Sequence, residues 1–313
     1  MNPVLIAGPT ASGKSDLALA LAERIGGEIV SVDSMQVYRG LDVGTAKPTD
    51  AERRRVPHHL LDVVPLDDTY DAARFVADAT AAISGIVERG RVPILCGGTG
   101  LYFNAWLNGL GSAPAPDPVL RSELESLSTE VLLDELARRD WETFDAIDLR
   151  NRRRIVRAVE VIRITGRPFS AQRASWPERA PTMAGRAFGI RRPAPMLVER
   201  IHRRVDRMFE AGLVEETRRL LELGLERNRV AMQAIGYRQV VEHLQGARGF
   251  RDTVELVKSR TRQFAKRQRT WFEGQMDLEW LEIPSEVDAA TLGDSLARRL
   301  QGTPQWELGQ TTM

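Results

Sequence analysis

The sequence predicts an α/β fold in which a parallel sheet is flanked by helices and a helical insertion domain interrupts the chain. Three short apolar runs, at residues 4–7, 28–32 and 92–96, lead into loops of glycine or small polar residues, which is typical of buried parallel strands. The first run is followed by apolar residues at helical spacing. A proline-rich stretch at residues 111–118 then precedes a helical pattern over residues 119–166.

The loop after the first apolar run contains the motif GPTASGKS. Its glycine, lysine and serine spacing, between a strand and a helix, is the P-loop pattern. Backbone amides, the positive end of the next helix and the lysine charge favour a multiply charged phosphate, and the Ser15 hydroxyl suits Mg²⁺. We predict that the phosphate contacts Gly8, Pro9, Thr10, Ala11, Ser12, Gly13, Lys14 and Ser15. The motif alone does not say whether the ligand is a nucleoside triphosphate.

Polar side chains follow the other two runs. Asp33 ends the second run, and Thr99 lies in the glycine-rich turn after the third. Ligands of open parallel sheets bind outside the carboxyl ends of the strands, so both side chains should lie near the phosphate. The pattern leaves two roles open for Asp33: an aspartate that only orders Mg²⁺, or a base that accepts a proton.

The rest of the chain predicts the domain organisation. Residues 186–193 and 278–283 read as further strands, and residues 196–223 and 253–272 read as long amphipathic helices. We expect an α/β catalytic core from residues 1–112 and 183–302, with C-terminal helices. The helical insertion spans residues 113–182, and a disordered tail covers residues 303–313.

The composition is that of a globular protein, with 42% apolar and 28% charged residues among 313. The single cysteine, Cys96, excludes an internal disulfide framework and reads as a small core residue. The four histidines lack metal-ligand spacing. No apolar run approaches membrane-spanning length, and the early P-loop leaves no room for a signal peptide, so we expect a cytoplasmic protein with no membrane contact.

Basic residues are concentrated in two segments, although the formal net charge is only +1. The segments, residues 150–157 and 260–272, are typical of a surface that binds a polyanion such as RNA. In the second segment Arg262, Lys266 and Arg269 share one helical face with few acidic neighbours. A phosphate backbone is the favoured partner of that face.

Arg204 lies beside the apolar stripe of the helix predicted at residues 196–223, where an unpaired guanidinium would be costly. Two kinds of partner fit this position. One is a structural carboxylate such as Asp206 or Glu160, which the pattern alone favours. The other is a bound phosphate, which a guanidinium can hold in bidentate fashion.

Six segments together make the chain resemble one family. They are GPTASGKS, VDSMQVYRGLDVGTAKP, PHHLLD, GGTGLY, AIGYRQ and TRQFAKRQRTWF, and they span residues 8 to 272 in the family's order. The combination is similar to that of the tRNA dimethylallyltransferases, the tRNA isopentenyl diphosphate transferase family. In that family the kinase-like P-loop holds the diphosphate of dimethylallyl diphosphate, which is a leaving group and not a phosphoryl donor.

The resemblance implies transfer of a dimethylallyl group from dimethylallyl diphosphate to the exocyclic N6 of the adenosine 3′ of the anticodon, with release of diphosphate. The P-loop with Mg²⁺ and Arg204 would hold the diphosphate. Asp33 would be the general base, with Lys14 and Thr99 also catalytic.

The resemblance also implies how a monomer would bind the tRNA anticodon stem-loop. Asp33, Ser34, Met35 and Gln36 would read a base flipped out of the RNA. The other residues that would contact tRNA are Gly100, Ser122, Arg153, Arg154, Arg157, Gln233, Arg238, Lys266, Arg267, Arg269 and Trp271.

Two other classes of function remain open. A small-molecule or nucleoside kinase would explain the P-loop and the sheet, but not the two basic segments. An RNA-binding protein without chemistry would explain the charge, but would have no use for Asp33 and Thr99 beside a phosphate. Whether ATP binds this nucleotide-binding motif also stays open.

Overall fold

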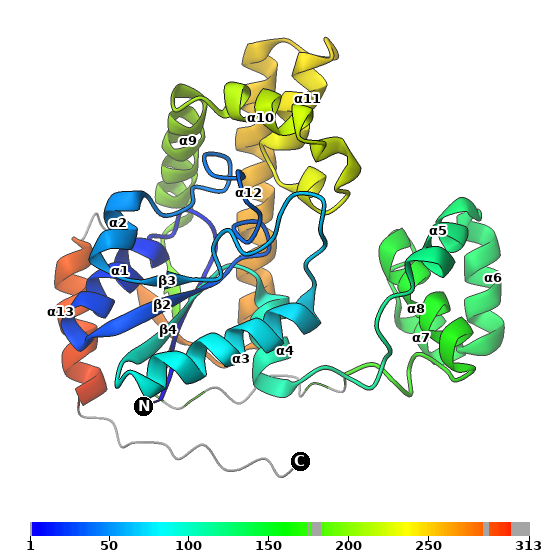
Figure 1. The fold of residues 1–313 in the computed structure, drawn as a ribbon, viewed down its shortest axis with the longest axis horizontal. Coiled ribbons are helices and arrows are strands. Elements are labelled where there is room, and N and C mark those ends of the chain that lie inside the picture. Colours follow the sequence, from blue (N-terminus) through cyan, green and yellow to red (C-terminus); the bar gives the residue numbers. More distant parts are fainter. Residues whose placement is uncertain (1, 175, 177–182, 184, 284–287, 302–313) are drawn as a thin grey trace. The chain divides into compact units, whose positions relative to one another are not determined.

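The computed structural model describes residues 2–174, 176, 183, 185–283 and 288–301. These residues form two compact units (Figure 1). The sheet unit comprises the described parts of Met1–Leu107 and Pro177–Met313, and the helical unit is Asn108–Trp176. The predicted tail at residues 303–313 lies outside the described residues.

The sheet unit is built on six parallel strands in the order β3-β2-β4-β1-β5-β6 (Figure 1). The strands are β1 (Val4–Ala7), β2 (Gly27–Val32), β3 (His58–His59), β4 (Val92–Gly97), β5 (Ala187–Arg191) and β6 (Glu279–Glu282). The predicted α/β fold with a parallel sheet is therefore confirmed.

Three strands end in line at one edge of the sheet. Ala7 of β1 and Val32 of β2 both lie opposite Gly97, the last residue of β4. Gly97 is required there, because a Cβ atom would lie 2.0 Å from the Val32 carbonyl oxygen. The loops that carry the P-loop, Asp33 and Thr99 consequently leave the sheet at the same edge.

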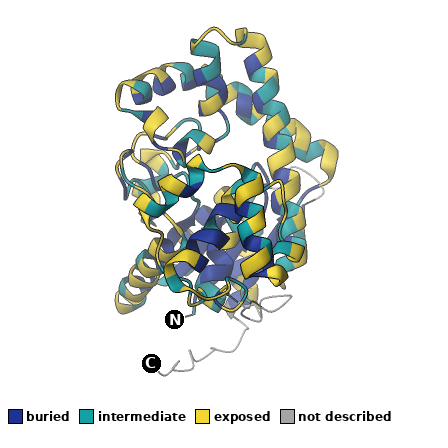
Figure 2. Cartoon of the chain, turned by 90° about the vertical axis from the view of Figure 1, so that its right-hand side faces the viewer, coloured by how far each residue is buried: buried dark blue, intermediate teal, exposed yellow. Residues whose placement is uncertain are grey.

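Strand side chains alternate between two apolar clusters, one on each face of the sheet. Leu5 and Ala7 join the cluster that contains residues of α3 (Ala72–Glu88) and α4 (Gly100–Asn108). Val4 and Ile6 join the other, with residues of α1 (Lys14–Ile25) and α13 (Ala289–Gln301). The dark blue, buried segments in Figure 2 mark this core. Each large side chain buried there contributes about 1.5–3 kcal/mol of transfer free energy.

The remaining helices of the sheet unit are α2 (Asp50–Arg55), α9 (Ala194–Glu210), α10 (Leu213–Glu222), α11 (Tyr237–Leu244) and α12 (Phe250–Gln275), with 3₁₀ turns at Leu225–Arg227 and Ala231–Gln233. The single helix predicted at residues 196–223 is wrong, because the chain breaks between α9 and α10 at Gly212. Gly212 has φ 92°, a left-handed conformation that ends one helix and starts the next.

The helical unit contains α5 (Pro118–Ser126), α6 (Thr129–Arg139), α7 (Trp141–Ala146) and α8 (Arg152–Thr165). Leu124, Leu132, Leu136 and Ile155 are fully buried and belong to an apolar cluster of its own. Among the described residues of both units, no helix combines the length and the apolar character needed to cross a bilayer.

Candidate active site

The P-loop is held in shape by side chains from distant parts of the chain. Ala11 has φ 62°, a left-handed conformation that is costly for a residue with a Cβ and is typical of functional loops. Arg200 Nε donates to the Ala11 carbonyl oxygen at 2.9 Å, and Arg192 Nε donates to that of Ser12 at 2.7 Å. These two arginines fix the loop where it turns into α1.

Lys14 begins α1 beside this loop, and its Nζ donates to the Pro9 carbonyl oxygen at 3.3 Å. Burial is the largest effect on the Lys14 amine and lowers its pKa, and the positive charge of Arg204 lowers it further. The negative charge of Asp33 acts in the opposite direction. Bringing these cations together favours an anionic ligand.

Arg204 projects from α9 and donates from Nη2 to the Thr45 carbonyl oxygen at 3.2 Å. Burial lowers the pKa of its guanidinium, while Asp33 and Asp16 raise it. The two carboxylates that the sequence suggested as partners are engaged elsewhere: Asp206 accepts Lys258 at 2.8 Å, and Glu160 pairs with arginines of the helical unit. Both carboxylates are thus engaged with other basic residues, and bound phosphate stays a prediction for Arg204.

The loop after β2 presents the predicted base-reading residues. Asp33 Oδ1 accepts the backbone N–H groups of Met35 at 2.8 Å and Gln36 at 3.3 Å. Thr99 Oγ1 accepts the N–H of Ser34 at 3.1 Å, which joins the loops after β2 and β4. The structure therefore brings Asp33, Thr99 and the P-loop lysine to one edge of the sheet.

Gln36 is held by hydrogen bonds at both ends of its amide. Its Oε1 accepts the Ser31 hydroxyl at 2.9 Å. Its Nε2 lies 3.3 Å from the Thr45 carbonyl oxygen and 3.4 Å from that of Ala46. Gln36 and Arg204 thus share the Thr45 carbonyl as an acceptor.

Gln268 on α12 is a site residue that the sequence reasoning missed. Its Oε1 accepts the Thr10 N–H at 2.9 Å, and its Nε2 donates to the Gly98 carbonyl oxygen at 2.9 Å. The side chain is only 8% exposed, so both bonds are shielded from water. A signal was available: Gln268 lies three residues after the apolar stripe residue Ala265, and a buried amide needs partners.

Predicted tRNA-contact residues of the sheet unit lie near this site, in the 3₁₀ turn Ala231–Gln233, and along α11 and α12. Trp271 covers Gly100, where a Cβ would lie 2.1 Å from the indole ring. Arg269 is half-buried, and its Nε is buried without a hydrogen-bond partner among the described residues. The exposed members are Gln233, Arg238, Lys266 and Arg267. Arg262, which the sequence grouped with Lys266, contacts His202 Nε2 at 2.5 Å.

The predicted tRNA-contact residues of the helical unit divide into two groups. Ser122, on α5, and Arg153 and Arg154, in the basic segment, are exposed. Arg157 instead donates to the fully buried Glu160 at 2.7 Å, and to the Pro114 carbonyl oxygen. Part of this segment's charge is therefore used to hold the unit together.

Few side chains of the described residues could bind a metal ion or act as a reactive thiol. Among the described residues, no cluster of three or more His, Cys, Asp or Glu side chains is arranged to hold a metal ion. Ser15 is exposed, and the Ser12 hydroxyl is buried without a partner in the described part of the chain. Burial raises the pKa of the Cys96 thiol to about 12, which keeps it protonated and unreactive.

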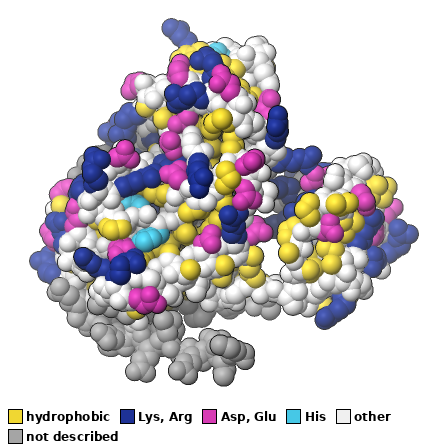
Figure 3. Space-filling view, viewed as in Figure 1, with side chains coloured by type: hydrophobic (Ala, Val, Ile, Leu, Met, Phe, Trp, Pro, Cys, Tyr) yellow, Lys and Arg dark blue, Asp and Glu magenta, His cyan; other side chains and the backbone are white. Residues whose placement is uncertain are grey.

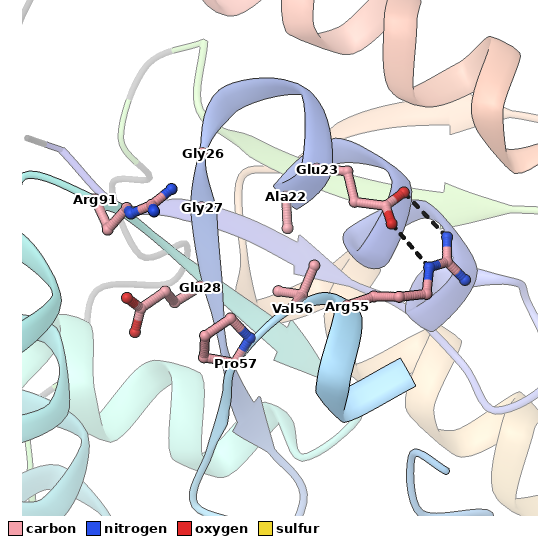
Figure 4. Close-up of a pocket in the computed structure, with 9 residues that line it drawn as sticks. All are labelled: Ala22, Glu23, Gly26, Gly27, Glu28, Arg55, Val56, Pro57 and Arg91. Atoms are coloured by element: carbon pink, nitrogen blue, oxygen red, sulfur yellow. Dashed lines mark hydrogen bonds and ion pairs between the residues drawn. The ribbon is translucent and has the colours of Figure 1, made fainter. Parts of the chain in front are cut away.

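One cavity of about 270 Å³ lies elsewhere (Figure 4). It is lined by Ala22, Glu23, Gly26, Gly27, Glu28, Arg55, Val56, Pro57 and Arg91. Gly27 begins β2, so the cavity lies at the amino edge of the sheet, opposite the P-loop edge. Glu23 and Arg55 form a two-bond ion pair beside it. In parallel sheets ligands bind at the carboxyl edge, so we place the active site at the P-loop.

The face of the sheet unit shown in Figure 3 carries no continuous positively charged surface among its described residues. On the face shown in Figure 3, Lys and Arg side chains of the sheet unit are interspersed with Asp and Glu. An anionic partner would therefore be held by particular basic residues.

Known proteins share both the sequence and the fold. A family model described as IPP transferase matches residues 36–275. A tRNA dimethylallyltransferase of Trichlorobacter lovleyi is 46% identical over 94% of this chain and 97% of its own. One of Pelotomaculum thermopropionicum is 40% identical over 96% of each chain.

Two solved structures resemble the chain in the same way. The tRNA isopentenylpyrophosphate transferase of Bacillus halodurans has a TM-score of 0.68 and 36% identity, covering 96% of this chain and 97% of its own. A eukaryotic dimethylallyltransferase described as acting on tRNA has a TM-score of 0.77 and 27% identity, covering 98% of this chain and 81% of its own. Because the family model matches residues 36–275 and these relatives match nearly the whole length of the chain, the chain belongs to the IPP transferase family of tRNA dimethylallyltransferases.

Proposed function

We propose that the chain transfers a dimethylallyl group from dimethylallyl diphosphate to N6 of the adenosine 3′ of the anticodon in tRNA and releases diphosphate. The observation that carries the proposal is the meeting of the P-loop with Asp33 and Thr99 at one edge of the sheet. The family membership supports the same reaction.

Asp33 is the residue that we assign as general base. The exocyclic amine of adenine is a poor nucleophile because its lone pair is conjugated with the ring, so a base must take its proton as the C–N bond forms. Two backbone N–H groups bind Asp33 Oδ1 and orient the carboxylate. We assign Oδ2 to the amine, and the Thr99 hydroxyl to orienting the amine or the leaving oxygen.

The positive groups of the site are assigned to the leaving diphosphate. Negative charge grows on the diphosphate oxygens as the bond between the allylic carbon and the diphosphate breaks. Lys14, Arg204 and the backbone amides at the start of α1 are the groups that would stabilise this charge. The exposed Ser15 hydroxyl is a hard oxygen donor of the kind that Mg²⁺ accepts beside phosphate oxygens. Bound Mg²⁺ would neutralise part of the diphosphate charge.

The tRNA is assigned to the loop after β2 and to exposed basic residues of α12. The target base must leave its stack to reach Asp33, and Ser34, Met35 and Gln36 lie on the same loop to contact its edges. Lys266 and Arg267 would hold the phosphate backbone of the anticodon stem-loop. We propose that the enzyme acts as a monomer in the cytoplasm and that its P-loop holds diphosphate and not ATP.

The test is transfer of label from dimethylallyl diphosphate to an anticodon stem-loop that carries the target adenosine. The protein is compared with Asp33→Asn, with the matched control Asp67→Asn at an exposed turn position, and with a stem-loop in which inosine replaces the adenosine. We expect label with the parent and the control only, and retained RNA binding by Asp33→Asn.

Other outcomes identify the rival functions. Phosphate release from ATP without label on any RNA would return the P-loop to the kinases. Loss of RNA binding in Asp33→Asn, with no turnover by the parent, would indicate a binding protein without chemistry.

A further inference from the structure

A buried carboxylate that the proposed chemistry does not use lies on α10. Glu216 is only 4% exposed. Its Oε2 accepts the Val43 N–H at 2.9 Å, and its Oε1 accepts the Gly44 N–H at 3.3 Å. The Tyr237 hydroxyl of α11 also donates to Oε1, at 2.5 Å. A carboxylate taken out of water and given these donors holds the backbone turn that it grips in one position.

Tyr237 contacts the same turn directly. Its hydroxyl accepts the Gly44 N–H at 3.1 Å while it donates to Glu216. The phenol is fully buried, and burial raises the pKa of Tyr237 far above its usual value, so the hydroxyl remains a donor. Gly44 allows this approach, since a Cβ there would lie 2.5 Å from the Tyr237 ring.

The other side of this turn faces the active site. The Thr45 carbonyl oxygen accepts both Arg204 Nη2, at 3.2 Å, and Gln36 Nε2, at 3.3 Å. The Ala46 carbonyl lies 3.4 Å from the same Gln36 amide. The two residues whose amides Glu216 holds, Val43 and Gly44, therefore directly precede the two residues whose carbonyls contact Gln36 and Arg204.

We propose that Glu216 and Tyr237 are positioning residues for the transfer reaction and act on Arg204 and Gln36 through the turn at residues 43–46. The inference rests on the proposed roles of Arg204 toward the diphosphate and of Gln36 toward the target base. A displaced turn would move the acceptor that both side chains share, so donor affinity and base discrimination would weaken together.

The test compares Tyr237→Phe with two controls. Tyr70→Phe removes another phenol that donates to a carboxylate, Asp78 at 3.0 Å. Glu215→Gln changes the exposed neighbour of Glu216 on the same helix. We expect Tyr237→Phe to raise the KM for dimethylallyl diphosphate about tenfold, the change that a hydrogen bond to a charged group supports. It should also reduce the preference for a stem-loop with adenosine over one with 2,6-diaminopurine at the target, a base that keeps the accepting 6-amino group, whereas both controls should match the parent.

Double substitutions distinguish positioning from a general loss of stability. In an Arg204→Ala background, Tyr237→Phe should raise the KM for the donor less than twofold, because the residue through which it acts is gone. An undiminished tenfold effect in that background, an equal effect of Tyr70→Phe, or an unchanged KM in Tyr237→Phe would overturn the inference. Should Tyr237→Phe fail to fold, Glu216→Gln gives the same comparison, since its amide places donors against the backbone N–H groups.

Failure of this inference differs from failure of the proposed function. A parent protein that transfers no label refutes the function, whatever the variants do. A parent that transfers label while Tyr237→Phe and Glu216→Gln keep its KM and base preference refutes the positioning role alone.

Discussion

Replacing Gln268 by alanine tests whether α12 sets the geometry of the P-loop. The substitution removes the acceptor of the Thr10 N–H and the donor to the Gly98 carbonyl, both at 2.9 Å. Each buried group left without a partner costs about 1–3 kcal/mol, and water can reach the half-buried Thr10, so we expect a total near the lower end, about 2 kcal/mol. The melting temperature should fall by about 4–8 °C.

The kinetic effect should appear in donor binding. Without the Gln268 hydrogen bonds the P-loop must be ordered by the diphosphate when it binds, so the free energy of binding becomes less favourable. At about 1.4 kcal/mol per factor of ten, the KM for dimethylallyl diphosphate should rise about tenfold, and kcat should change less than about threefold. Steady-state label transfer at saturating stem-loop measures both constants.

A matched variant separates this role from a general effect on the helix. Gln263→Ala changes an exposed glutamine of α12 and should keep the parent KM and melting temperature. If Gln268→Ala melts early but keeps the parent KM, Gln268 only stabilises the fold, and the reasoning that connects α12 to the donor is refuted.

Three further outcomes are expected. Arg204→Gln should raise the KM for dimethylallyl diphosphate about a hundredfold, because a bidentate contact with phosphate is lost. The melting temperature of the free protein should not fall, because the substitution also removes a cation that is partly shielded from water, and a lower melting temperature would contradict this. Burial lowers the pKa of Lys14 in the folded protein below its ordinary value of 10.5, so the cost of burying the charged amine is present in full at any pH below the folded-state pKa. As the pH rises from the folded-state pKa toward 10.5, the amine loses its proton and the free energy of unfolding should increase. The affinity for dimethylallyl diphosphate should fall over the same pH range, because the positive charge is lost. A KM profile of Lys14→Arg, whose charge persists, should lack that alkaline rise. Glu160→Gln should leave Arg121 and Arg157 without their carboxylate partner and lower the free energy of unfolding of the helical unit by about 3 kcal/mol. The melting temperature of this unit should fall by more than about 10 °C. RNA binding should weaken, and the KM for dimethylallyl diphosphate should not change.

Local sequence signals sufficed for the sheet and the loops at its carboxyl edge. The runs that end at Ala7, Val32 and Gly97 are short, apolar and followed by flexible residues, so strand type and loop position are both set by neighbours in sequence. The P-loop spacing and the polar residues Asp33 and Thr99 could be read in the same way.

Contacts between distant segments could not be read from the sequence. Gln268 and Thr10 are 258 residues apart, and no local pattern pairs a helix amide with a loop N–H. The sequence left two kinds of partner open for Arg204 for the same reason, since no local pattern shows that Lys258 of another helix pairs with Asp206. The break at Gly212 was missed since apolar residues continue at helical spacing on both sides, and only the left-handed φ of the glycine separates α9 from α10.

Because α12 is one continuous helix, residues cannot be inserted into it or deleted from it without moving the side chains that contact the site. Each residue added to a helix rotates everything beyond it by about 100°, so one insertion between Thr261 and Gln268 would turn Gln268 away from the P-loop and Trp271 away from Gly100. Exposed Lys266 and Arg267 lie on the same turns and would lose their direction as well. We therefore expect relatives to vary in length within the loop before α12, at residues 245–249, while this part of the helix keeps its residue count.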